Sequence, residues 1–141
     1  MLNARTINSQ RVLHIVVPAR AEYLSLIRLV VAGIAARSGF SADSIADIKV
    51  ALSEASSNVI RHAYATDTPY AERVIEINCY DDNGSLLLEV TDHGHGMPIL
   101  PPPSEGLGFG IMGSLMDKVD VETADDGTSV LMSKLSMTAR R

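Results

Sequence analysis

The chain has 141 residues, of which 46% are hydrophobic and 21% charged. This length and composition predict a single globular domain, residues 1–141, with its own core. The net charge of -5 argues against a duplex-binding surface, which needs a basic stripe to neutralise phosphates. Aromatic residues make up only 4% and Trp is absent, so a base-stacking platform is not expected either. We therefore expect no direct binding of nucleic acid.

No segment is expected to enter a membrane. The N-terminal sequence MLNARTINSQR lacks the apolar region of a secretory signal. The longest apolar run, residues 29–36, is too short to span a bilayer. We therefore expect a cytoplasmic protein. Its one cysteine, Cys79, excludes an internal disulfide and is expected to be a small buried hydrophobic residue.

The first half of the chain predicts one strand followed by two helices. Residues 11–18, RVLHIVVP, are rich in β-branched side chains, which favour a strand. Apolar residues recur at helical spacing over 21–37, and Gly39 ends that helix. A second helix is expected over 42–64, with Ser41 as its N-cap.

The second half predicts two hairpins separated by a loop and a helix. RVIEINCY alternates apolar and polar residues, and SLLLEVTD is the returning strand after the turn DDNG at 81–84. A Gly- and Pro-rich loop over 93–107 precedes a helix that starts near Gly108. KVDVETA and SVLMSKL, joined by DDGT, form the last hairpin.

The element order β-α-α-β-β-loop-α-β-β predicts an α/β two-layer sandwich. Its sheet is expected to be mixed but mostly antiparallel, with helices covering one face. We expect the ordered core to extend over about 11–136.

Polar residues form a column on the second predicted helix, where Glu54, Asn58 and His62 follow one another at four-residue steps. Side chains spaced in this way have Cβ atoms about 5–6 Å apart. A carboxylate at Glu54 can accept a proton from an attacking hydroxyl, and the amide oxygen of Asn58 can ligate Mg²⁺. Taken alone, this column is more typical of a solvated helix face.

The segment DHGHG follows a predicted strand and begins with Asp92. Gly94 and Gly96 would let the backbone approach a ligand closely, and a carboxylate at a strand end can accept from an exocyclic amine. An ordinary turn is the alternative interpretation. The two histidines of this segment are a weak metal signal, and we do not expect zinc.

Glycines open the helix after the loop, in the segment GLGFGIMG. Gly108, Gly110 and Gly113 match G-x-G-x-x-G, but PPPSE precedes them where a dinucleotide-binding fold requires a strand. We reject that fold and retain a phosphate-binding helix N-terminus. The fourth segment, DGT, ends at Thr128 and alone indicates only a hairpin turn.

The four segments occur in a characteristic order: E-x-x-x-N, D-x-G-x-G, G-x-G and G-T. This order resembles the Bergerat-type ATP site of the GHKL superfamily. Over residues 14–135 the chain further resembles the anti-sigma factor serine/threonine kinases of that superfamily. The resemblance implies a histidine-kinase-like ATPase domain that uses ATP and Mg²⁺.

The resemblance also implies roles for individual residues. Glu54 would act as, or orient, the general base, and Asn58 would ligate Mg²⁺. Asp92 would accept from the adenine amino group, and Thr128 would join this network through water. His62 is expected to be structural.

Other implied roles concern the phosphates and the protein partners. The glycines that would shape the adenine pocket or wrap the phosphates are Gly94, Gly96, Gly106, Gly108 and Gly110. Arg28 would contact protein partners. The expected lid, about residues 96–107, contains no Lys or Arg, although part of the family carries a basic residue there.

The expected function is that of an anti-sigma factor that is also a protein-serine/threonine kinase. It would bind a sigma factor, phosphorylate an anti-anti-sigma STAS-domain protein, and work as a homodimer. One alternative is a non-catalytic ATP-binding module of the same fold, favoured by the lid without a cation. Another is the catalytic half of a split histidine kinase.

Overall fold

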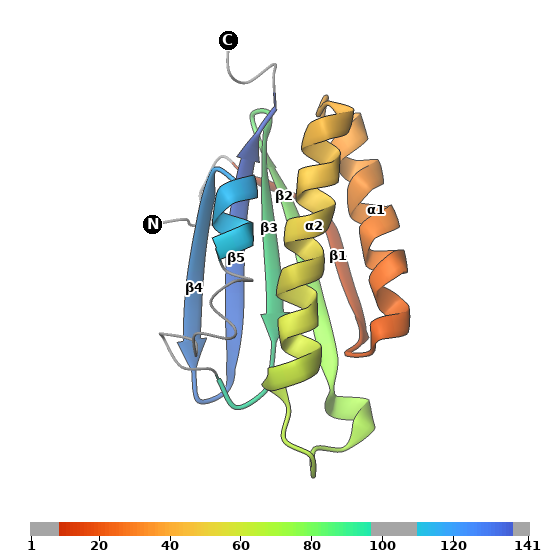
Figure 1. Cartoon of the computed structure of the whole chain (residues 1–141), viewed down its shortest axis with the longest axis vertical. Coiled ribbons are helices and arrows are strands. Elements are labelled where there is room, and N and C mark those ends of the chain that lie inside the picture. The colour runs from red at the N-terminus through yellow and green to blue at the C-terminus, as the bar shows by residue number, and fades with distance from the viewer. Residues whose placement is uncertain (1–8, 97–109, 137–141) are drawn as a thin grey trace.

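The computed structural model describes residues 9–96 and 110–136 of the chain. Within them, five strands form one sheet in the order β1-β2-β3-β5-β4 (Figure 1). The strands are β1 (Gln10–Pro18), β2 (Val74–Asp82), β3 (Ser85–Asp92), β4 (Lys118–Ala124) and β5 (Gly127–Leu135). Each neighbouring pair is antiparallel. The sheet that we expected to be mixed is therefore fully antiparallel over the described residues.

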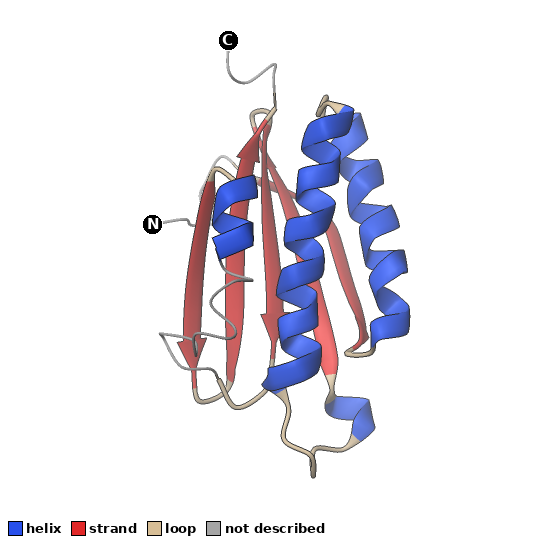
Figure 2. Ribbon diagram, viewed as in Figure 1, coloured by secondary structure: helices blue, strands red, loops and turns tan. Residues whose placement is uncertain are grey.

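Helices cover one face of this sheet. Helix α1 (Leu24–Arg37) follows a short 3-10 turn (Ala21–Tyr23), and α2 (Ala42–Asn58) packs beside it. A shorter helical segment, residues 110–115, lies over β4 and β5 on the same face (Figure 2). The predicted two-layer α/β sandwich is confirmed.

The helix ends follow local signals in the sequence. The Ser41 hydroxyl accepts a hydrogen bond from the Ser44 backbone N–H at 3.1 Å, which is the expected N-cap of α2. Gly39, with φ of 86°, ends α1 in the left-handed conformation that suits glycine. The second helix departs from the prediction: it is α-helical only to Asn58 and then makes a π-helical turn, Val59–Ala63. Such turns are rare and are frequent at functional sites.

The hydrophobic core lies between the helices and the sheet. It comprises the apolar faces of α1 and α2, alternate side chains of the strands, and Met112 and Met116 of the segment after the lid. Cys79 is part of this core, as predicted, and burial raises the pKa of its thiol to about 12. The thiol is therefore protonated at neutral pH.

The other sheet face carries no helix in the described part of the chain (Figure 2). It holds a small apolar contact between Leu87 and Leu131, and polar pairs such as Asn78–Glu89 and Thr91–Ser129.

None of the described helices combines the length and apolar character needed to cross a bilayer.

Candidate functional site

Glu54 and Asn58 lie one turn apart near the end of α2. Glu54 is half-buried, and Asn58 is only 4% exposed. The Asn58 amide oxygen accepts a hydrogen bond from Arg61 Nη2 at 2.9 Å. Its buried Nδ2 has no hydrogen-bond partner within the described residues. A buried amide of this kind costs free energy, so Asn58 is poorly explained by folding alone.

The amide oxygen of Asn58 fits the chemistry of Mg²⁺. That ion takes hard oxygen ligands and binds through one or two protein oxygens together with phosphates and waters. Arg61 now donates to this oxygen, so the guanidinium would have to move for the oxygen to reach a cation.

Asp92 ends β3 and is buried, with 3% of its surface exposed. Its Oδ1 accepts from the Gly94 backbone N–H at 3.0 Å, and the backbone N–H of Thr128 also donates to its carboxylate. Burial raises the pKa of Asp92, and the two backbone donors only partly offset this effect. A further donor would therefore stabilise the charged carboxylate, and an exocyclic amine is such a donor.

Thr128 lies directly opposite Asp92 in the register of β3 and β5. Its buried hydroxyl lies 2.9 Å from the hydroxyl of Thr123 on β4. Asp92 and Thr128 both line a cleft of about 270 Å³ at this end of the sheet. The structure thus brings together the two residues that we expected on the adenine side.

The glycines of this region bring backbone against backbone. A Cβ on Gly94 would collide with the carbonyl of Ala63, and one on Gly96 would collide with that of Ala124. We expected these two glycines to admit a ligand, but their immediate neighbours are protein carbonyls. Gly127, which belongs to the G-T segment but was given no role of its own, has a φ of 145° and lies against the carbonyl of Asp92.

We predict that Gly94→Ala destabilises the fold and disorders the site. The added methyl group would overpack the contact with Ala63 and lower the free energy of unfolding by about 1–3 kcal/mol. Gly33→Ala is the matched control, because a Cβ at Gly33 meets nothing within 4 Å and Ala is preferred in a helix. Urea denaturation of both variants measures the difference, and equal stabilities would contradict the packing argument.

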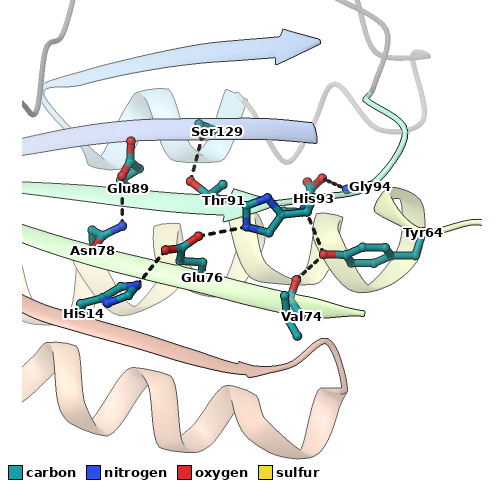
Figure 3. A network of polar contacts seen from close by, with 11 residues as sticks. His14, Tyr64, Val74, Glu76, Asn78, Glu89, Thr91, His93, Gly94 and Ser129 are labelled. Carbon is teal, nitrogen blue, oxygen red and sulfur yellow. Dashed lines mark hydrogen bonds and ion pairs between the residues drawn. The ribbon is translucent and has the colours of Figure 1, made fainter. Parts of the chain in front are cut away.

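The segment after β3 is tied to the end of the second helix (Figure 3). The backbone N–H of His93 donates to the Tyr64 hydroxyl at 3.1 Å, and that hydroxyl donates to the Val74 carbonyl at 2.6 Å. The His95 backbone N–H donates to the Ala63 carbonyl at 3.1 Å. Sequence reasoning missed Tyr64, because nothing local marks a tyrosine after a helix as an anchor.

The remaining predicted site residues are distributed as follows. Gly106, Gly108 and nearly all of the expected lid lie outside the described residues, and Gly110 is exposed in the helical segment 110–115. His62 is half-buried in the π-helical turn. Arg28 lies on α1, away from Asp92, and donates to the Ser53 hydroxyl at 3.1 Å.

The family of the chain follows from comparison with known proteins. Residues 17–134 match the model of the histidine kinase-like ATPase domain family, and the chain belongs to this family. A similar curated relative is the serine-protein kinase RsbW of Bacillus cereus (strain B4264), which is 38% identical over 132 residues. That match covers 84% of this chain and 81% of the relative. RsbW of Bacillus anthracis (strain CDC 684 / NRRL 3495) is 37% identical, and that match also covers 84% of this chain and 81% of the relative. The predicted resemblance to this group of kinases is confirmed.

Solved structures agree on the fold. The structure of the RsbU and RsbW domains of Rv1364c from Mycobacterium tuberculosis matches with a TM-score of 0.69 at 23% identity. The match covers 88% of this chain and 31% of that one. The histidine kinase domain of the Erythrobacter litoralis EL346 blue-light activated histidine kinase matches with a TM-score of 0.60 at 22% identity, covering 88% and 64%.

Proposed function

We propose that this protein is a cytoplasmic anti-sigma factor with ATP-dependent protein-serine/threonine kinase activity. It binds a sigma factor in one state and phosphorylates an anti-anti-sigma STAS-domain protein in another, acting as a homodimer. The observation that carries the proposal is the 38% identity to a serine-protein kinase, extending over 81% of that relative. The buried pair of Asp92 and Thr128 and the helix pair of Glu54 and Asn58 support it.

Adenine recognition would rest on the buried carboxylate of Asp92. Two backbone N–H groups already hold this carboxylate, so it is fixed in place before the nucleotide arrives. The amino group of adenine would add a third donor, and Thr128 would complete the polar wall. A carboxylate accepts but does not donate, so this arrangement favours adenine over a base with a carbonyl in that position.

Phosphate transfer would depend on the end of α2. The reaction requires positioning and charge neutralisation more than covalent participation of the protein. Glu54 would accept the proton of the attacking serine or threonine hydroxyl. Asn58 would hold Mg²⁺, which when bound would neutralise the phosphate oxygens. Arg61, beside Asn58, adds a positive charge near this point, whereas the expected lid has none.

Asn58→Ala is predicted to remove the dependence of ATP affinity on Mg²⁺. The wild-type protein should bind ATP at least about tenfold more tightly with Mg²⁺ than with chelator, and the variant should bind equally in both. Calorimetric titration measures the two dissociation constants. Ser57→Ala, a half-buried neighbour, is the control and should retain the dependence. Persistence of the Mg²⁺ effect in Asn58→Ala would contradict the assignment.

Partner binding would use the surface around Arg28. The guanidinium is joined to Ser53, the residue before Glu54 in α2, so this surface is coupled to the catalytic helix. Leu26 and Leu29 on the same helix are 45% and 72% exposed.

Arg28→Ala should therefore weaken binding of the sigma factor or of the STAS protein without changing ATP affinity. A competition experiment between the two partners measures the binding, and a separate titration with ATP measures the nucleotide affinity.

One alternative function is favoured by a specific observation. The expected lid contains no Lys or Arg, which is compatible with a module that binds ATP without transferring phosphate. In that case Mg-ATP would change partner affinity, and the STAS protein would gain no phosphate. The other alternative, half of a split histidine kinase, shares the fold but lacks support at the sequence level, since the matching histidine kinase domain is 22% identical.

A further inference from the structure

Two histidines and a carboxylate meet on the sheet face that carries no described helix (Figure 3). His14 Nε2 lies 2.7 Å from Glu76 Oε2, and His93 Nε2 lies 3.0 Å from Glu76 Oε1. The two imidazoles come from β1 and from the segment after β3, and Glu76 comes from β2 between them. One carboxylate therefore bridges three neighbouring segments of the sheet.

The strand register explains this bridge. Glu76 pairs with Thr91 across β2 and β3, so its side chain can reach diagonally to His93, two residues further along the same face. Successive residues of a strand point to opposite faces. The side chain of Asp92 therefore lies on the helix side of the sheet, while its neighbour His93 is held on the other side.

The segment that carries Asp92 is attached mainly through its backbone. The Tyr64 hydroxyl holds it at His93, the Asp92 carboxylate at Gly94, and the Ala63 carbonyl at His95. The side chain of His93 adds a bond across the sheet to Glu76. Glu76 thus gives this segment an attachment from the face opposite the expected nucleotide.

We propose that Glu76 is a positioning residue of the nucleotide site, which helps to hold the Asp92–Gly94 segment in place through its hydrogen bond with His93. The inference rests on the proposed function, because it assumes that Asp92 binds the nucleotide. It assigns to Glu76 and His93 a role on the side of the sheet remote from the ligand.

The Glu76 carboxylate keeps its charge well into the acid range. Burial would raise the pKa of Glu76, but the hydrogen bonds and charges of His14 and His93 lower it below its usual value. The contribution of Glu76 therefore disappears only as the pH falls through that lowered value.

The test is a double-mutant cycle on Mg-ATP binding at neutral pH. Glu76→Gln and His93→Ala should each bind Mg-ATP about two- to fivefold more weakly than wild type, the range typical of an exposed ion pair. The double variant should bind no more weakly than either single variant, because both substitutions remove the same bond. Glu89→Gln is the matched control, because Glu89 lies on the same face and bonds Asn78 instead.

A second measurement follows the backbone of the Asp92–Gly94 segment directly by NMR. Glu76→Gln should shift the amide resonances of His93 and Gly94, and Glu89→Gln should leave them unchanged. Additive effects of Glu76→Gln and His93→Ala on binding, or unchanged amide resonances in Glu76→Gln, would overturn the role of Glu76. Wild-type protein that binds no nucleotide would instead overturn the proposed function, and this role with it.

Discussion

Glu54→Gln is expected to lower the kcat of phosphate transfer by about 10²–10⁴-fold, the contribution of a general base. Gln preserves the size of the side chain and its capacity for hydrogen bonds, but it cannot take a proton from serine or threonine. Glu54 is half-buried on α2, one turn before Asn58, so the substitution leaves the core intact. Single-turnover transfer from labelled ATP measures the effect.

The affinity for ATP separates this role from a binding role. If Glu54 acts only in the chemical step, the dissociation constant for Mg-ATP should stay within about twofold of the wild-type value. Asp43→Asn, an exposed carboxylate in the first turn of the same helix, serves as control and should transfer phosphate normally. Phosphate transfer by Glu54→Gln at the wild-type rate would contradict the assignment of Glu54 as the general base.

Asp92→Asn is expected to weaken ATP binding by about ten- to hundredfold, the value of a hydrogen bond to a charged group. An amide presents one acceptor oxygen where the carboxylate presents two, and both backbone donors already compete for it. Asp43→Asn, the exposed carboxylate in the first turn of α2, is again the control. Equal affinity of Asp92→Asn and wild type for ATP would exclude Asp92 from the adenine site.

The same variant should change how stability depends on pH. The pKa of Asp92 is raised in the folded protein, mainly by burial. The folded state therefore retains a proton at pH values where the unfolded chain has released it, and the free energy of unfolding falls as the pH rises through that window. Asn does not titrate, so the melting temperature of Asp92→Asn should fall less than that of wild type over the same rise in pH. An unchanged pH dependence would contradict this account.

Much of the fold could be predicted because its signals are local. Alternating polarity marks β2, an apolar run follows in β3, and Ser41 caps α2 as expected. The turn between those strands places Asn83 and Gly84 at positive φ, the geometry of a two-residue hairpin. The π-helical end of the second helix could not be predicted, since its last residue, Ala63, meets the backbone of the segment after β3.

The site was predictable to the extent that its residues sit in short motifs. Asp92 and Thr128 are 36 positions apart in the sequence, yet the order of the motifs assigned both to one pocket, and the register of β3 and β5 brings them together. Contacts that depend only on the strand register could not be predicted from the sequence. The bond between Glu76 and His93 depends on a diagonal between two strands, and no spacing in the sequence reveals it.

The central claim is transfer of the γ-phosphate of ATP to a serine or threonine of a STAS-domain protein. It is tested most directly by incubating the purified full-length chain with Mg-ATP labelled at the γ-position and the cognate STAS protein, followed by mass spectrometry of that partner. We predict one added phosphate on a serine or threonine, formed by wild-type protein and not by Glu54→Gln. A folded partner that binds the protein but gains no phosphate would contradict the kinase assignment and favour the non-catalytic ATP-binding module.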